Sequence, residues 1–326
     1  MMTYPVYQVP VDAFDDFEDM GTKSKFWYTD PDTQEQYLFK STHTEDKNGD
    51  TVVRNGEDWA EKIACELARL LNLPHADYDL ATHNGEHGIR TKKFTMEGDR
   101  LIAGNILIED IVTNILNTVL EPKQQSHTVA RVISAMDFII KMPPKGWEPI
   151  KNVQTAKEVF IGYVLLDCLI SNQDRHNENW AMVTHADGSK SLAPTFDHAA
   201  SLGRNESDEK REAMLRPEQG RRDVSGYVKR CKSWYYIDGN RLKTLEAFAL
   251  FSSFAPEAAV EWLTRLDSIR DEQIHAILDN FPEGYLSVIQ KEFCFKLITE
   301  NKQNILNSLD NIIDLSTRLQ NIRENK

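Results

Sequence analysis

The apolar pattern of this chain changes its period near residue 105, and this change limits the folds that the chain can adopt. In the first third, alternating apolar side chains bounded by turn-forming residues predict strands at 25–28, 36–40, 77–81 and 88–94. A helix interrupts these strands, because Trp59, Ile63 and Leu67 share one face and Pro74 follows the last turn. Beyond residue 105 the period is helical, with candidate helices near 106–119, 128–140 and 155–171. Strands followed by helices are typical of an α+β protein with two unlike lobes.

The length of 326 residues fits one large two-lobed domain or two ordinary ones, and a content of 40% apolar and 27% charged residues is that of an ordinary globular protein. We therefore predict a single domain, 1–326. Its β-rich N-terminal lobe spans residues 1–98 and includes the helix 57–73, and its helical C-terminal lobe spans residues 99–326. The polar stretch 44–56 between strand and helix is predicted to be a loop.

The charge of the chain excludes some functions. A net charge of −13 argues against direct binding of nucleic acid, which needs a surplus of Lys and Arg. The N-terminus is acidic where a signal peptide has a basic start, and the longest apolar run, 160–170, contains Asp167 and is too short to span a bilayer. We expect a cytoplasmic protein without a membrane span.

The cysteines lack the paired spacing of zinc sites, so we expect buried, reduced thiols at Cys65, Cys168, Cys231 and Cys294.

The densest polar stretch directly follows the predicted helix 155–171 and reads Asn172-Gln-Asp-Arg-His-Asn-Glu-Asn179. A short strand-like stretch comes next, and a second one leads to Pro194-Thr-Phe-Asp197. Asp174, Asn179 and Asp197 can therefore lie around one hairpin. A polar loop after a helix is most often a capped turn, so each residue alone carries little information, but the set in this order favours a function.

These residue types suit the transfer of a phosphoryl group from ATP, which depends mainly on positioning and charge neutralisation. Mg²⁺ prefers oxygen ligands, which the amide of Asn179 and the carboxylate of Asp197 can supply. Asp174 can then accept the proton of an attacking hydroxyl. An Asp, an Asn five residues later and an Asp eighteen residues after that match the spacing of protein kinases.

The same segments resemble the HipA-like serine/threonine kinases of bacteria and, more distantly, the phosphoinositide kinases. The resemblance rests on Asn172-x-Asp-Arg-His-Asn-x-Asn179 and Leu192-Ala-Pro-x-Phe-Asp197. It implies a two-lobed protein-kinase-like fold, ATP and Mg²⁺ as cofactors, Asp174 as the catalytic base, and Asn179 and Asp197 as metal ligands. It also implies a protein substrate and an antitoxin-like regulator as a candidate partner.

The flanking residues differ from the eukaryotic protein-kinase signature. That signature has His-Arg before the base and Phe-Gly after the metal-binding Asp. Here Asn172-Gln173 precede Asp174, and His198-Ala199 follow Asp197. The sequence thus favours a HipA-like kinase over the eukaryotic type.

Two residues of the N-terminal lobe fit the nucleotide site. Lys40 ends the strand 37–40, and Glu61 lies in the first turns of the next helix. In kinases a strand Lys that binds the phosphates pairs with a helix Glu in this order. We predict that Lys40 binds ATP and that Glu61 holds it, with Glu57 and Asp58 as alternatives to Glu61.

A small glycine-containing segment precedes the first predicted strand: Gly21, Thr22, Lys23, Ser24 and Lys25. Small residues let backbone N–H groups approach phosphate oxygens, and the lysines add positive charge. The segment lacks the Walker frame, but it resembles the phosphate-binding loop of HipA-like proteins, which predicts nucleotide contacts. By the same resemblance Ser24 is a hypothetical autophosphorylation site.

Some roles stay open at this level. His176 either contacts a nucleotide phosphate or orders its loop, and Arg175 either binds phosphate or pairs with a nearby acid. The segment 204–232 holds nine Lys and Arg against six Asp and Glu, so it is either a contact surface for an acidic substrate or a solvated loop.

The sequence therefore predicts an ATP-dependent phosphotransferase, most simply a HipA-like kinase that phosphorylates Ser or Thr of a protein. Two alternatives remain. One is a lipid or small-molecule kinase of the phosphoinositide-kinase type, and the other is a pseudokinase that binds nucleotide without turnover.

Overall fold

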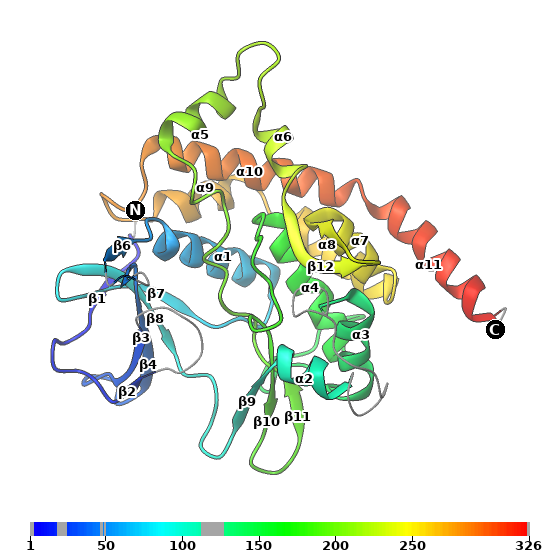
Figure 1. The fold of residues 1–326 in the computed structure, drawn as a ribbon, viewed down its shortest axis with the longest axis horizontal. Coiled ribbons are helices and arrows are strands. Elements are labelled where there is room, and N and C mark those ends of the chain that lie inside the picture. Colours follow the sequence, from blue (N-terminus) through cyan, green and yellow to red (C-terminus); the bar gives the residue numbers. More distant parts are fainter. Residues whose placement is uncertain (1–2, 18–24, 46–47, 49, 112–126, 325–326) are drawn as a thin grey trace.

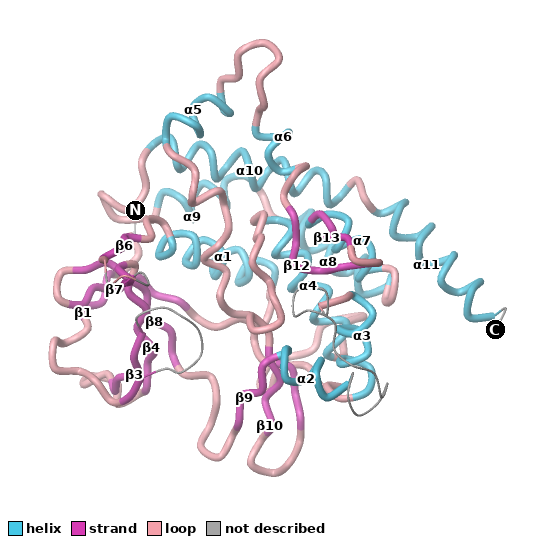
Figure 2. The backbone as a smooth tube through the Cα atoms, in the orientation of Figure 1, coloured by secondary structure: helices cyan, strands magenta, loops and turns pink. Residues whose placement is uncertain are grey.

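The computed structural model describes residues 3–17, 25–45, 48, 50–111 and 127–324. Figure 1 and Figure 2 show a β-rich part built from the N-terminal third and a larger, mostly helical part built from the rest of the chain. The α+β class predicted from the sequence is confirmed. Among the described residues, no helix is long and apolar enough to cross a membrane.

A six-stranded sheet forms the N-terminal part, with its strands in the order β1-β7-β8-β4-β3-β2. β3 and β4 form the predicted antiparallel hairpin. Asn84 and Gly85, both at positive φ, make the two-residue turn between β7 and β8. The strands are β1 (Val6–Gln8), β2 (Asp16–Phe17), β3 (Lys25–Thr29), β4 (Gln36–Ser41), β7 (Tyr78–His83) and β8 (Glu86–Lys92).

The polar stretch between β4 and the first helix differs from the prediction of a loop. β5 (His43–Glu45) and β6 (Thr51–Val53) pair there as a two-stranded antiparallel ribbon. Val52 and Val53 are the apolar residues of this stretch, and both are exposed. A short ribbon whose apolar side chains are exposed leaves no alternating apolar pattern in the sequence.

Helix α1 (Glu57–Leu71) lies between the sheet and the helical part. Trp59, Ile63 and Leu67 are buried, as their spacing predicted, and Asn72 ends the helix in the left-handed conformation. α1 contacts β7 and β8 on one side and the helices α4 (Ala156–Leu169), α8 (Pro256–Ser268) and α9 (Asp271–Asp279) on the other. It therefore connects the two parts of the fold.

The helical part is organised around α4, which is buried on nearly all sides and packs against α7, α8 and α10. Thr155 and Glu158 form a capping box that fixes the start of α4. The remaining helices are α2 (Gly104–Asp110), α3 (Val129–Phe138), α5 (Asp208–Leu215), α6 (Val224–Val228), α7 (Thr244–Ser252), α10 (Val288–Leu306) and α11 (Leu309–Glu324).

Two small sheets accompany these helices. β9 (Arg100–Ala103) pairs with β10 (Ala181–Thr184), which pairs with β11 (Lys190–Leu192), so β9 joins the sheet of the later hairpin rather than the N-terminal sheet. β12 (Lys232–Ile237) and β13 (Asn240–Lys243) form a second hairpin. The single domain and the lobe boundary at 98/99 stay predictions. All four cysteines are buried and free of disulfides, which confirms that expectation.

Candidate active site

The polar loop 172–179 leaves the C-terminal end of α4 and is ordered by its own side chains. Asn172 accepts a hydrogen bond from the backbone N–H of Asp174 at 3.0 Å. The side-chain amide nitrogen of Asn179 donates to the carbonyl of Asp174 at 2.7 Å, so its amide oxygen points away from this contact. The loop is thus closed on itself, with the Asp174 backbone held from both ends.

Arg175 connects the polar loop to its surroundings, and its side chain is buried, with 1% of the residue exposed. Its Nε and Nη2 atoms contact the two carboxylate oxygens of Asp167 on α4, at 2.9 and 2.8 Å. Its Nη1 atom donates to the carbonyl of Asn179 at 2.6 Å and to that of Phe196 at 3.0 Å. One guanidinium therefore joins the polar loop to the segment that carries Asp197.

The ion pair with Asp167 keeps Arg175 charged. Burial alone would lower the pKa of the guanidinium, but the charge and hydrogen bonds of Asp167 outweigh burial and raise the pKa above its usual value. Of the two readings left open by the sequence, the structure selects pairing with an acid for Arg175. Asp167 interrupts an apolar run in the sequence, and a carboxylate at such a position is the signal that a buried cation lies nearby.

Asp174 presents its side chain to solvent, with 45% of that side chain exposed. Nε2 of His176 lies 4.0 Å from its Oδ1 atom, and Nδ1 of His176 accepts a hydrogen bond from the backbone of Glu178. His176 also packs edge-on against the ring of Trp234 in β12, while the Asp174 carboxylate is accessible to an incoming group.

Asp197 adopts a left-handed backbone conformation, with φ at 60°. This region is uncommon for a residue with a Cβ atom and is enriched at functional sites. The backbone N–H of Asp197 donates to the hydroxyl of Tyr78 on β7 at 3.3 Å. Its Oδ1 atom lies 3.8 Å from Nζ of Lys40 on β4, so a strand lysine and the proposed metal ligand meet at one place.

Glu61 makes a different contact from the one predicted. Both of its carboxylate oxygens accept from the backbone N–H of His198 at 2.8 Å, and Oε1 lies 2.9 Å from Nδ1 of the same residue. Both side chains are buried. Nε2 of His198 lies 2.8 Å from the hydroxyl of Thr195. In the described residues Glu61 thus holds the segment around Asp197 from α1, in place of the expected pair with Lys40.

A small pocket lies where these groups meet. It is lined by residues in and directly after β4, one residue of β8, the N-terminal turns of α1 and the Asp197 segment: Lys40, Ser41, Thr42, Glu57, Asp58, Glu61, Ile89, Asp197 and Ala199. Burial raises the pKa of Asp58. Lys40 faces the carboxylates of α1 and of Asp197 across this pocket. It is the one Lys or Arg among the described residues of the lining, so it is the group there that can bind a phosphate.

The predicted phosphate-binding segment is only partly visible. Gly21, Thr22, Lys23 and Ser24 lie outside the described residues. Lys25 begins β3 and is half-buried, directly opposite Lys40 in the neighbouring strand. The start of β3 is thus adjacent to the strand position of Lys40.

Comparison with known proteins places the chain in a family. Residues 19–277 match the family of HipA-like C-terminal domains. The chain belongs to this family. It is also 24% identical, over 293 residues, to the serine/threonine-protein kinase CtkA of Helicobacter pylori, an alignment that covers 88% of this chain and 81% of CtkA. The chain is thus a distant homologue of a serine/threonine kinase and carries a HipA-like kinase domain.

Solved structures show the same fold. The crystal structure of the Helicobacter pylori proinflammatory kinase CtkA superposes with a TM-score of 0.72 at 21% identity, covering 96% of this chain and 99% of CtkA. HipA from Shewanella oneidensis, in a complex with HipB and operator DNA, superposes with a TM-score of 0.52 at 10% identity, covering 95% of this chain and 70% of HipA. The two-lobed kinase fold expected from the sequence is therefore confirmed.

The donor set of this HipA-like domain fits a hydrated magnesium ion. Mg²⁺ takes oxygen ligands, usually one or two from protein, and Asn179 and Asp197 offer an amide oxygen and a carboxylate on segments that Arg175 joins. The sequence did not reveal Tyr78 or His198 as supports of the Asp197 segment. Tyr78 reads only as an apolar strand residue, and Glu61, the acid that contacts His198, lies 137 positions away in the sequence.

Proposed function

We propose that this chain is an ATP- and Mg²⁺-dependent kinase that transfers the terminal phosphoryl group of ATP to Ser or Thr of a protein. Asp174 is the catalytic base, Asn179 and Asp197 hold Mg²⁺, and Lys40 binds the nucleotide phosphates. The observation that carries this proposal is the position of Arg175, whose Nη1 atom contacts the carbonyls of Asn179 and Phe196. Through this contact the base, both metal ligands and their loops form one unit.

The chemistry follows from these positions. The hydroxyl oxygen of the acceptor attacks the γ-phosphorus of ATP, its proton goes to the carboxylate of Asp174, and the bond to the bridging oxygen breaks to release ADP. Asp174 suits this role because its carboxylate is exposed while its backbone is fixed by Asn172 and Asn179. Asn179 and Asp197 would hold Mg²⁺, which would neutralise negative charge on the phosphates of ATP. Lys40 adds a fixed positive charge beside Asp197.

Partners are inferred from the relatives. CtkA is a serine/threonine-protein kinase, which supports a protein hydroxyl as the acceptor here. HipA of Shewanella oneidensis is part of a toxin–antitoxin system with HipB, which supports an antitoxin-like regulator as a candidate partner of this chain. Binding of nucleic acid by the chain itself is not part of the proposal.

Incubation with γ-labelled ATP, Mg²⁺ and a bacterial protein extract tests this function. We expect label on protein, recovered as phosphoserine or phosphothreonine by mass spectrometry, with wild type and not with Asp174→Asn. Label recovered only in lipid or small molecules would contradict the protein acceptor. Nucleotide binding without any transfer would identify a pseudokinase and overturn the proposal.

A further inference from the structure

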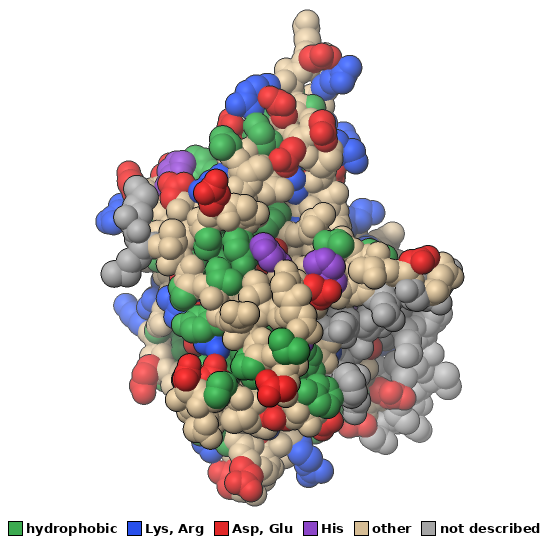
Figure 3. Space-filling model, turned by 90° about the vertical axis from the view of Figure 1, so that its left-hand side faces the viewer, with side chains coloured by type: hydrophobic (Ala, Val, Ile, Leu, Met, Phe, Trp, Pro, Cys, Tyr) green, Lys and Arg blue, Asp and Glu red, His purple; other side chains and the backbone are tan. Residues whose placement is uncertain are grey.

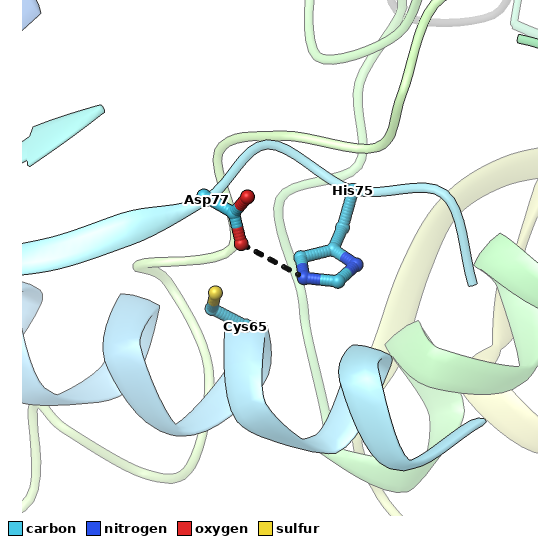
Figure 4. A group of neighbouring side chains, drawn as sticks. All are labelled: Cys65, His75 and Asp77. Carbon is cyan, nitrogen blue, oxygen red and sulfur yellow. Dashed lines mark ion pairs between the residues drawn. The ribbon is translucent and has the colours of Figure 1, made fainter. Parts of the chain in front are cut away.

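A second group of potential ligands lies where α1 faces the start of β7. We propose that Cys65, His75 and Asp77 form a binding site for Zn²⁺ or a closely related transition-metal ion (Figure 4). One ligand atom from each residue, namely the thiol sulfur, an imidazole nitrogen and a carboxylate oxygen, lies within 4.8 Å of the other two. Among the described residues, this is the one such group of three His, Cys, Asp or Glu side chains.

The donor set and spacing suit zinc. Thiolate, imidazole and carboxylate are the ligands that Zn²⁺ takes in proteins, at about 2.0–2.3 Å, so neighbouring donors of a tetrahedral site lie roughly 3.5 Å apart. Nε2 of His75 already lies 3.5 Å from Oδ1 of Asp77. Because the three ligand atoms lie within 4.8 Å of one another, bringing the sulfur of Cys65 to this spacing requires a movement of at most about 1.3 Å. Water can fill the fourth position on the open side of Asp77.

His75 is oriented for this role. Its Nδ1 atom lies 2.6 Å from the carbonyl of Leu73, to which a protonated Nδ1 donates. This contact selects the tautomer in which Nε2 carries the lone pair, as it does in many metal-binding histidines. Nε2 is shielded from solvent and makes no hydrogen bond within the described part of the chain. The described groups next to Nε2 are the carboxylate of Asp77, at 3.5 Å, and the thiol of Cys65, and both are potential metal ligands.

Cys65 differs in its surroundings from an inert buried thiol. Its sulfur accepts hydrogen bonds from the backbone N–H of Tyr78 at 3.4 Å and from Arg69 at 3.8 Å. A metal ion binds the thiolate form of cysteine, so binding here displaces the proton of the Cys65 thiol. Cys65 is 1% exposed, whereas the side chain of Asp77 is 65% exposed, so an ion enters from the Asp77 side.

Arg69 competes with a metal ion for the carboxylate of Asp77. Its Nη2 atom lies 2.8 Å from Oδ1 of Asp77, while its Nε atom lies 3.3 Å from Glu66 one turn earlier on α1. The side chain is half-exposed, so it can move to Glu66 alone and vacate the carboxylate. The guanidinium therefore neutralises the cluster without metal, and its removal should strengthen metal binding.

The site adjoins the segment that carries Asp197. The backbone N–H of Thr195 donates to Pro74, and that of Ala76 donates to Thr195, which forms a parallel bridge at His75. Tyr78 follows directly and contacts the backbone of Asp197. A metal bound here would fix the segment 74–78 to α1 through Cys65. The same segment also contacts the residues that lead to Asp197.

The test measures metal binding by the full chain and needs no phosphotransfer. Chelator-treated protein is titrated with Zn²⁺ alone against a chromophoric chelator, and with Co²⁺ for the near-ultraviolet absorption of a cobalt–thiolate bond. We expect one Zn²⁺ per chain and a cobalt–thiolate band. Cys65→Ser and His75→Gln should each weaken binding by about 100-fold or more, since even an outer contact of a metal site contributes about 10- to 100-fold.

Cys294→Ser is the matched control, because Cys294 is equally buried on another helix, α10. It should keep wild-type affinity, and Arg69→Gln should bind Zn²⁺ more tightly than wild type. If the wild-type protein takes up no stoichiometric Zn²⁺, or shows no cobalt–thiolate band, the site does not exist. Wild-type affinity in His75→Gln would also overturn it, even if Cys65→Ser failed to fold.

Discussion

Arg175 and Asp167 form a two-pronged ion pair that is closed to solvent, with contacts of 2.9 and 2.8 Å. The same guanidinium reaches the carbonyls of Asn179 and Phe196, so the pair fixes two separate loops to helix α4. A planar cation with several donors is required for this arrangement, and lysine cannot reproduce it.

We therefore expect Arg175→Met to lower the free energy of unfolding by about 3–5 kcal/mol, because it leaves the Asp167 carboxylate buried without a counter-charge. The double variant Arg175→Met/Asp167→Leu removes both charges and should recover much of this loss. Its kinase activity should stay low, because the two loops are no longer joined. Denaturant unfolding and phosphate transfer measure the two effects. Full recovery of activity in the double variant would contradict a positioning role for Arg175.

Glu61 offers a second test, because its contact is with His198 rather than Lys40. Glu61→Gln weakens two charge-assisted hydrogen bonds, and we expect a loss of about 2 kcal/mol in stability. Its activity should need more Mg²⁺ for half-saturation, since the Asp197 segment loses its support from α1. Glu300→Gln on α10 serves as the control. An increase in the KM for ATP with an unchanged Mg²⁺ requirement would instead indicate the Lys40–Glu61 pair.

Asp197 allows strain and chemistry to be separated. Asn tolerates positive φ nearly as well as Asp, so Asp197→Asn should fold normally and still transfer phosphate about 100-fold more slowly or worse. Asp197→Ala should lose the same activity and, in addition, about 1 kcal/mol of stability. Thermal unfolding of both variants beside their rates checks this. Normal activity in Asp197→Asn would remove Asp197 from the proposed metal site.

Because His127 is buried, we expect the free energy of unfolding to fall in acid. Burial lowers its pKa to about 3, and the ring accepts from the indole N–H of Trp180 while its other nitrogen lies 3.0 Å from the Trp234 carbonyl. The unfolded state binds this proton below about pH 6.5, whereas the folded state does not until about pH 3, so this contribution to stability is complete above pH 6.5. It should fall by about 1.4 kcal/mol per pH unit between these values.

Denaturant unfolding at several pH values measures this slope. His127→Gln removes the titrating group and should flatten the slope between about pH 6 and pH 4, at the cost of lower stability at pH 7. An unchanged slope would show that another group controls acid unfolding.

The sequence predicted those features that depend on local periodicity. The β3–β4 hairpin, the apolar face of α1 and the polar loop after α4 follow from residues that are neighbours in the chain. The partner of Glu61 does not, because His198 lies 137 positions away and Glu57 and Asp58 offered the same charge within one turn. Long-range pairs between buried polar groups leave no periodic signal, and the β5–β6 ribbon leaves none because its apolar side chains are exposed.

The segment 204–232 also took a form that composition could not decide. Arg204 and Arg211 are largely buried and pair with Glu57 and Asp208, so part of its basic charge is structural. The stretch between α5 and α6 stands out from the body, and Figure 3 shows acidic and basic side chains together at this projecting end. On the side shown, the surface charge of this stretch is therefore mixed.

The central claim is tested most directly by the rate of phosphate transfer to an identified protein acceptor in a single turnover at saturating ATP and Mg²⁺. We predict that Asp174→Asn transfers about 10²- to 10⁴-fold more slowly than wild type, which is the usual contribution of a positioned general base, and that it binds ATP equally well. Asp187→Asn, an exposed carboxylate in the turn between β10 and β11, should match wild type. Wild-type rates in Asp174→Asn would contradict the account.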